Sequence, residues 1–119
     1  MKFLLIFLGG GFGSVIRYAV SKYLNNADNC IPYGTLLVNI IGSFIIGTVI
    51  GLSLKDGIDN NQTLFFAVGF AGGFTTFSTF AFENATLIED GNYVHLALYI
   101  STSIILGVAA VFLGLSMAK

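Results

Sequence analysis

The chain has few charged residues and little cysteine. Only 9% of its 119 residues are charged, against roughly a quarter in soluble domains, while 55% are hydrophobic and the mean hydropathy is +0.88. The net charge of −1 excludes a basic surface for nucleic acid. The single cysteine, Cys30, excludes an internal disulfide and a cysteine metal site. This composition predicts a membrane protein with no soluble domain.

Residues for catalysis are scarce as well. His95 is the one histidine, and no cysteine or carboxylate stands at metal-ligand spacing from it. The glycine-rich stretch GGGFGS has neither the lysine nor the spacing of a phosphate-binding loop. The sequence therefore predicts a protein that is not an enzyme.

Four apolar stretches divide the chain, and polar clusters such as KDGIDNNQ and EDGN separate them. They cover about residues 3–24, 34–54, 63–88 and 93–117. Each is close to the roughly 20 residues that a helix needs to cross a bilayer. We expect the first stretch to be retained, because no A-x-A-like cleavage site follows it. The prediction is an all-α membrane protein with one transmembrane domain over residues 1–119.

An oligomer is expected, because four helices cannot surround a wide aqueous pore. Small residues recur every four positions, as at Gly9 and Gly13, and this spacing lets helices pack closely within one chain or between copies. The same spacing joins Ser43, Gly47 and Gly51, and also Ala110 and Gly114. Lys2, Lys55 and Lys119 would share one side of the membrane, with Lys22 and Arg17 towards the other. This weak bias permits insertion in both orientations.

Several polar residues lie inside the apolar stretches, where each needs a partner or a wet cavity. Arg17 would either reach the interface or attract anions into a vestibule. Asn39 would either bond a neighbouring helix or offer its amide donors to an anion. Tyr99 and Ser103 share one face of the fourth stretch, which predicts a polar strip on that helix.

The third stretch contains GFAGGFTTFSTF at residues 69–80. The pair Gly72 and Gly73, followed by Thr75 and Thr76, weakens a helix and predicts a break there. Carbonyl groups freed at a break would suit a hard cation. A kink that only improves packing is the alternative interpretation.

Two aromatic residues follow the predicted break. Phe77 and Phe80 are three apart and project from one helix face, with Ser78 and Thr79 beside them. The edge of an aromatic ring is electropositive, so such rings could attract an anion weakly enough to release it. Ordinary packing against lipid or protein explains the same pattern.

Three motifs in order, GGGFGSVIRY, GTLLVNIIGSFIIG and GFAGGFTTFSTF, resemble the Fluc (CrcB-type) fluoride channel family over essentially the whole chain. The resemblance implies an antiparallel, dual-topology homodimer of four-helix subunits whose third helix is broken. It also implies a fluoride-selective channel in the plasma or inner membrane of a prokaryote. Such a channel would export fluoride passively from the cytoplasm and so lower its toxicity.

The resemblance also assigns roles to residues. The fluoride pathway would comprise Asn39, Phe77, Ser78, Thr79, Phe80, Tyr99 and Ser103. Arg17 would lie in a vestibule, and Glu83 would have a gating or structural part. The backbone carbonyls of Gly72 and Thr75 would hold one structural Na⁺ at the dimer centre. Gly107 and Val111 stand where some relatives have hydroxyls, which leaves the extent of the polar strip past Ser103 open.

Two other classes fit a chain of this size. A small proton-coupled multidrug exporter shares four spans and dual topology, but it needs a carboxylate within the first helix, and residues 1–27 contain none. A scaffold protein without transport activity is the other class. The interrupted polar helix predicted at residues 69–80 argues against it.

Overall fold

The structure, a computed structural model, describes residues 1–26 and 30–118, and this part of the chain is helical. The elements are α1 (Lys2–Leu24), α2 (Tyr33–Leu54), α3 (Asn60–Thr63), the π-helix η1 (Leu64–Ala71), α4 (Gly72–Phe74), α5 (Ser78–Glu89) and α6 (Tyr93–Ala118). Four segments are long and apolar enough to span a membrane: Lys2–Leu24, Tyr33–Leu54, Asn60–Glu89 and Tyr93–Ala118. The predicted all-helical architecture with four spans is confirmed. Lys119, which contributed to the predicted charge bias, lies outside the described residues.

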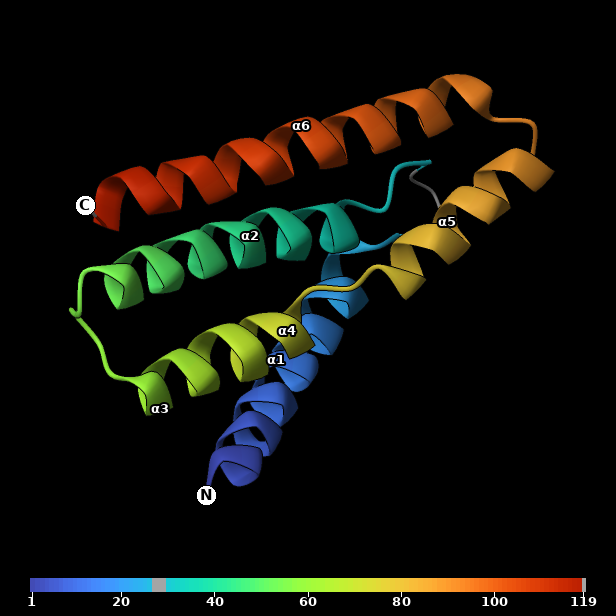
Figure 1. Cartoon of the computed structure of the whole chain (residues 1–119). Coiled ribbons are helices and arrows are strands. Elements are labelled where there is room, and N and C mark those ends of the chain that lie inside the picture. The colour runs from blue at the N-terminus through green and yellow to red at the C-terminus, as the bar shows by residue number, and fades with distance from the viewer. Residues whose placement is uncertain (27–29, 119) are drawn as a thin grey trace.

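The helices form a thin body of 48 × 28 × 19 Å. α2 and α6 run side by side in the same direction, while α1 packs against η1 and α4 (Figure 1). α5 leads away from α4 and packs mainly on α6. Large apolar side chains such as Phe3, Phe12 and Phe112 are exposed, as expected for helices in contact with lipid.

The contact between α1 and the η1–α4 segment is made by glycines facing backbone. A Cβ atom at Gly9 would overlap Phe65, and one at Gly13 would overlap Phe70. From the other side, a Cβ atom at Gly73 would overlap the backbone of Gly10. The small residues of α1 therefore serve helix packing within one chain.

α2 and α6 approach each other in the same way at their C-terminal halves. Gly47 faces the backbone of Val111, and Gly114 faces the backbone of Phe44 and Thr48. The N-terminal halves of the two helices carry polar side chains, among them Asn39 of α2 and Ser103 of α6. The candidate site lies beside these side chains.

Helical geometry stops between α4 and α5. α4 ends at Phe74, Thr75 is extended with φ −88° and ψ 159°, and α5 begins at Ser78. Before this point the chain forms a π-helix from Leu64 to Ala71, a rare conformation that is frequent at functional sites. Thus the segment containing GFAGGFTTFSTF departs from regular α-helix twice, first in the π-helix that ends at Ala71 and then in the extended backbone of Thr75.

Candidate functional site

A groove of about 470 Å³ lies between α2, α6 and the segment that joins α4 to α5. It is lined by Asn39, Ser43, Ile46, Thr75, Thr76, Phe77, Phe80, Ser103, Ile104 and Val111. All ten of these side chains are neutral, and half of them carry a hydroxyl or an amide. The groove therefore offers dipoles and ring edges to a solute, without formal charge.

Asn39 of α2 connects this groove to the interrupted segment. Its Nδ2 donates to the Thr76 carbonyl at 3.1 Å, and its Oδ1 accepts from the Thr76 N–H at 2.8 Å. The side-chain amide thus replaces both hydrogen bonds that Thr76 would make in a continuous helix. Of the two roles expected for Asn39, the interhelical hydrogen bond is present, and the same residue lines the groove.

The hydroxyls of two threonines satisfy the ends of the interruption. Thr75 Oγ1 donates to the Ala71 carbonyl at 2.9 Å, which closes the end of α4. Thr76 Oγ1 accepts from the Thr79 N–H at 3.2 Å and so caps the first turn of α5. In a continuous helix, the N–H of Thr76 would bond Gly72 and that of Thr79 would bond Thr75. Both donors are diverted to side chains here.

Two aromatic rings, Phe77 and Phe80, line the groove, and a third ring, Tyr99, packs against Phe80. The centroids of Phe77 and Phe80 are 6.0 Å apart with their planes at 47°, and those of Phe80 and Tyr99 are 5.0 Å apart at 57°. Phe77 is 79% exposed, whereas Tyr99 is fully buried. The rings are tilted rather than stacked face to face, so a ring edge can face a neighbouring group.

The remaining predicted pathway residues are divided between the groove and its surroundings. Ser103 lines the groove, and its buried Oγ has no hydrogen-bond partner within residues 1–26 and 30–118. Ser78, Thr79 and Tyr99 are not among the residues that line this groove. Ser78 is exposed and Thr79 is half-buried on α5, while Tyr99 packs against Phe80. Among the groove-lining residues, Ser103 therefore has a hydroxyl that the described residues leave without a partner.

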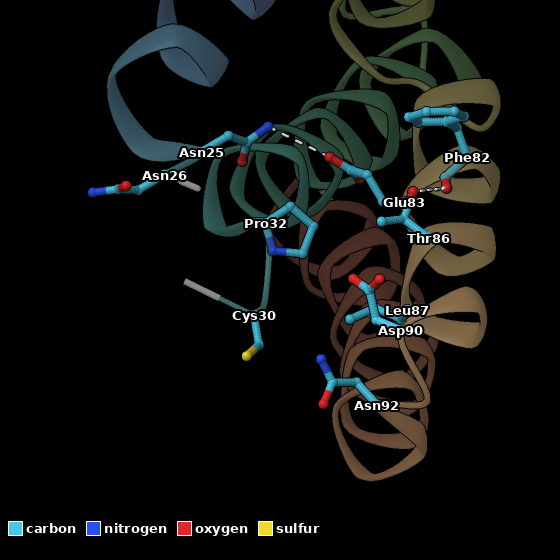
Figure 2. Close-up of a pocket in the computed structure, with 10 residues that line it drawn as sticks. All are labelled: Asn25, Asn26, Cys30, Pro32, Phe82, Glu83, Thr86, Leu87, Asp90 and Asn92. Atoms are coloured by element: carbon cyan, nitrogen blue, oxygen red, sulfur yellow. Dashed lines mark hydrogen bonds between the residues drawn. The ribbon is translucent and has the colours of Figure 1, made fainter. Parts of the chain in front are cut away.

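Glu83 of α5 is held by neutral donors from three other parts of the chain. Tyr99 Oη donates to Oε1 at 2.8 Å, and Thr35 Oγ1 donates to Oε2 at 2.8 Å. Asn25 Nδ2 contacts Oε2 at 3.5 Å, as the dashed line in Figure 2 shows. This network ties α5 to α2 and α6. Glu83 also lines a second hollow, of about 440 Å³, with Asp90 and Cys30 at its margin.

Asn25 follows the last residue of α1 and was not singled out from the sequence. Its Oδ1 accepts from the N–H groups of Gly34 at 2.7 Å and Thr35 at 3.2 Å, in the first turn of α2. Its Nδ2 donates to Thr35 Oγ1 at 3.0 Å. Thus one amide caps α2, orients Thr35 and reaches Glu83. The signal available in the sequence was the asparagine-rich stretch NNADN between two spans, since asparagine is a common capping residue.

Arg17 of α1 binds the end of α4. Its Nε donates to the Gly73 carbonyl at 3.0 Å, and Ser14 Oγ approaches the same oxygen at 3.5 Å. A cation at a helix C-terminus is favourable, because it meets carbonyls that lack helical partners. Arg17 lies outside the lining of the neutral groove and of the hollow beside Glu83.

Comparison with known proteins gives consistent matches over the chain. The family model described as "CrcB-like protein, Camphor Resistance (CrcB)" matches residues 4–115. A protein of Azobacteroides pseudotrichonymphae is 49% identical over 115 residues, covering 95% of this chain and 92% of the relative. A protein of Gloeothece citriformis is 43% identical over 120 residues, covering 100% of this chain and 98% of the relative. A protein of Thermus thermophilus is 40% identical over 114 residues, covering 95% of this chain and 90% of the relative. All three relatives are named "Fluoride-specific ion channel FluC".

Proposed function

The chain belongs to the CrcB family, and from that membership we propose that it is a multi-pass membrane protein that forms a fluoride-specific ion channel. Hydrogen fluoride enters a cell as a neutral acid and ionises at cytoplasmic pH, which traps the anion. A passive pathway in the plasma or inner membrane lets fluoride leave down its own gradient. The protein would thereby lower cytoplasmic fluoride without an energy source.

The neutral groove is the part of the molecule that we propose as the fluoride pathway. The observation that carries this proposal is the buried Ser103 Oγ, a hydroxyl without a partner in the described residues, on a residue that lines the same groove as Phe77 and Phe80. A small, strongly hydrated anion needs donors in place of water, and it must also be released. Hydroxyl donors and ring edges meet both requirements, because they stabilise an anion less than a fixed cation would.

We propose that Ser78, Thr79 and Tyr99 act around this pathway rather than within the groove of one subunit. Tyr99 supports the Phe80 ring and bonds Glu83, so Glu83 has a structural or gating part and does not carry the anion itself. Ser78 and Phe77 project from the exposed side of α5. In an assembled channel these exposed residues would meet a second copy.

An antiparallel, dual-topology homodimer is the assembly that we propose. A single chain extends 19 Å along its shortest axis, and the groove is not enclosed, so one copy supplies only part of a pathway wall. α5 packs mainly on α6 and leaves Phe77 and Phe82 exposed at 79% and 73%. The weak charge bias, with Lys2, Lys55 and Lys119 on one side and Lys22 and Arg17 towards the other, is compatible with insertion in both orientations.

We further propose that the third span, Asn60–Glu89, crosses the membrane as a helix broken at residues 75–77, and that the break holds Na⁺. The residues fit this ion, because the carbonyls of Gly72 and Thr75 have lost their usual N–H donors to Asn39 and Thr76. Gly73 and Thr76 carbonyls are bonded to Arg17 and Asn39. Bound Na⁺ would supply a positive charge that joins carbonyl groups of two subunits.

Fluoride efflux from liposomes containing the purified protein tests the proposal, with chloride as the comparison ion. A fluoride electrode should record rapid efflux when a potassium ionophore balances the charge. Chloride efflux under the same conditions should remain near that of empty liposomes. Equal efflux of both anions, or none of either, contradicts the proposed function.

A further inference from the structure

One face of α6 loses its hydroxyl groups halfway along the helix. Tyr99, Ser103, Gly107 and Val111 follow one another at intervals of four residues and so lie on one face. The first two carry hydroxyls and the last two do not. An anion that moves along this face beyond Ser103 would find no side-chain donor at Gly107 or Val111.

α2 runs beside α6 in the same direction (Figure 1). Thr35 and Tyr99 bond the same carboxylate, and Asn39 and Ser103 line the same groove. One turn further on, Ser43 Oγ lies 3.8 Å from the place where a Cβ atom of Gly107 would stand. Ser43 is thus opposite the first missing hydroxyl of α6.

We propose that Ser43 supplies the hydroxyl donor at this level, so that the polar track passes from α6 to α2 after Ser103. This inference rests on the proposed fluoride channel function. Ser43 lines the same groove as Ser103, and the absence of a side chain at Gly107 leaves its hydroxyl open towards α6. On the next turn of α2, Gly47 packs against the Val111 backbone, so the side-chain donors of α2 in this groove end at Ser43.

The hydroxyl of Ser43 has a backbone hydrogen-bond acceptor when no anion is near. Its Oγ donates to the Asn39 carbonyl, one turn earlier in α2, at 2.6 Å. A serine hydroxyl rotates about its C–O bond, and a hydrogen bond to an anion is roughly twice as strong as one to a neutral carbonyl. An arriving fluoride ion would therefore turn the Ser43 O–H away from the Asn39 carbonyl and accept its hydrogen bond. When the ion leaves, the O–H would turn back to the carbonyl. No proton is transferred in this exchange.

Three variants test the inference in the liposome assay. Ser43→Ala should lower fluoride efflux about tenfold, the effect of one lost hydrogen bond to an ion. Thr48→Val is the matched control, because Thr48 Oγ1 makes the same type of bond, to the Phe44 carbonyl at 2.9 Å, outside the groove. It should retain wild-type efflux. The double variant Ser43→Ala with Gly107→Ser returns a hydroxyl from α6 and should recover at least half of the lost rate.

The outcomes separate this inference from the proposed function. If the wild type conducts fluoride and Ser43→Ala conducts equally well, the inference is wrong and the channel function stands. Equal losses in Ser43→Ala and Thr48→Val, or no recovery in the double variant, would show a packing role for Ser43 and also overturn the inference. A wild-type protein without fluoride efflux contradicts the proposed function itself. Size-exclusion chromatography of every variant checks that assembly is unchanged.

Discussion

The two halves of the molecule differ in how far glycine contacts bring their helices together. In the first half, α1 meets η1 and α4 through glycines, and the backbones touch with no room for another carbon. In the second half, α2 and α6 also meet through glycines, but only towards their C-terminal ends, and polar and aromatic side chains of α2, α6 and the α4–α5 segment line a groove of about 470 Å³. Close backbone packing gives a rigid support, and bulky side chains hold open the space in which a solute can be bound.

The interrupted segment lies where these halves meet, and each half holds one side of it. Arg17, from the tightly packed half, binds the Gly73 carbonyl at the end of α4. Asn39, from the half that contains the groove, binds both backbone groups of Thr76. Irregular backbone in a membrane survives only when its polar groups find such partners. The position of Phe77 and Phe80 therefore depends on both halves.

The largest expected effect comes from filling the glycine contact. Gly13→Ala should destabilise the protein by about 3 kcal/mol or prevent its assembly, because the new carbon overlaps the backbone of Phe70 and Phe74. Gly11→Ala, which has no atom within 4 Å of the new carbon, is the matched control. Thermal unfolding in detergent measures the difference. Equal stability of the two variants would show that α1 does not pack as described.

A smaller loss is expected from removing the amide that holds Thr76. Asn39→Leu should cost about 2 kcal/mol, because it leaves an N–H and a carbonyl at membrane depth without partners. The disturbance should be local. Hydrogen–deuterium exchange should accelerate at residues 75–79 and stay unchanged in α1. Unchanged exchange at residues 75–79 would mean that the segment is held by other contacts.

The smallest stability effect is expected at the cap of α2. Asn25→Ala should cost about 1 kcal/mol, a typical value for a lost helix cap, and should loosen Glu83 through Thr35. Asn60→Ala, in the exposed helix α3, serves as the control. Thermal unfolding should show a measurable decrease for the first variant only. A decrease of the same size in both would argue against a special role for Asn25.

The sequence was sufficient to predict the spans, because apolar length alone decides which segments can cross a membrane. It also predicted a helix break near Gly72 and Thr75, since glycine and threonine there weaken a helix; Gly72 is helical and Thr75 is extended. The π-helix before this point was not predicted, because its residues Leu64–Ala71 form an apolar run with no signal for a shift in hydrogen-bond spacing.

The partners of individual polar residues were harder to predict. Asn39 was expected either to bond a helix or to line a pathway, and only the three-dimensional arrangement shows one amide doing the first while facing the groove. Asn25 and Thr35 were not predicted to meet Glu83, because they are far from it along the chain. Long-range hydrogen bonds depend on the packing of whole helices, which residue spacing does not specify.

Fluoride efflux from Phe80→Ile, compared with Phe70→Ile, tests the central claim that the groove and its rings conduct the ion. Phe70 is stacked on Phe74 in the packed half, with ring centroids 5.6 Å apart, and provides a matched loss of one ring. Both variants should assemble as the wild type does. Fluoride efflux should fall about tenfold or more in Phe80→Ile, because an electropositive ring edge is lost from the pathway, and should stay within about twofold of wild type in Phe70→Ile. Unchanged efflux in Phe80→Ile, or an equal loss in both variants, would contradict the account.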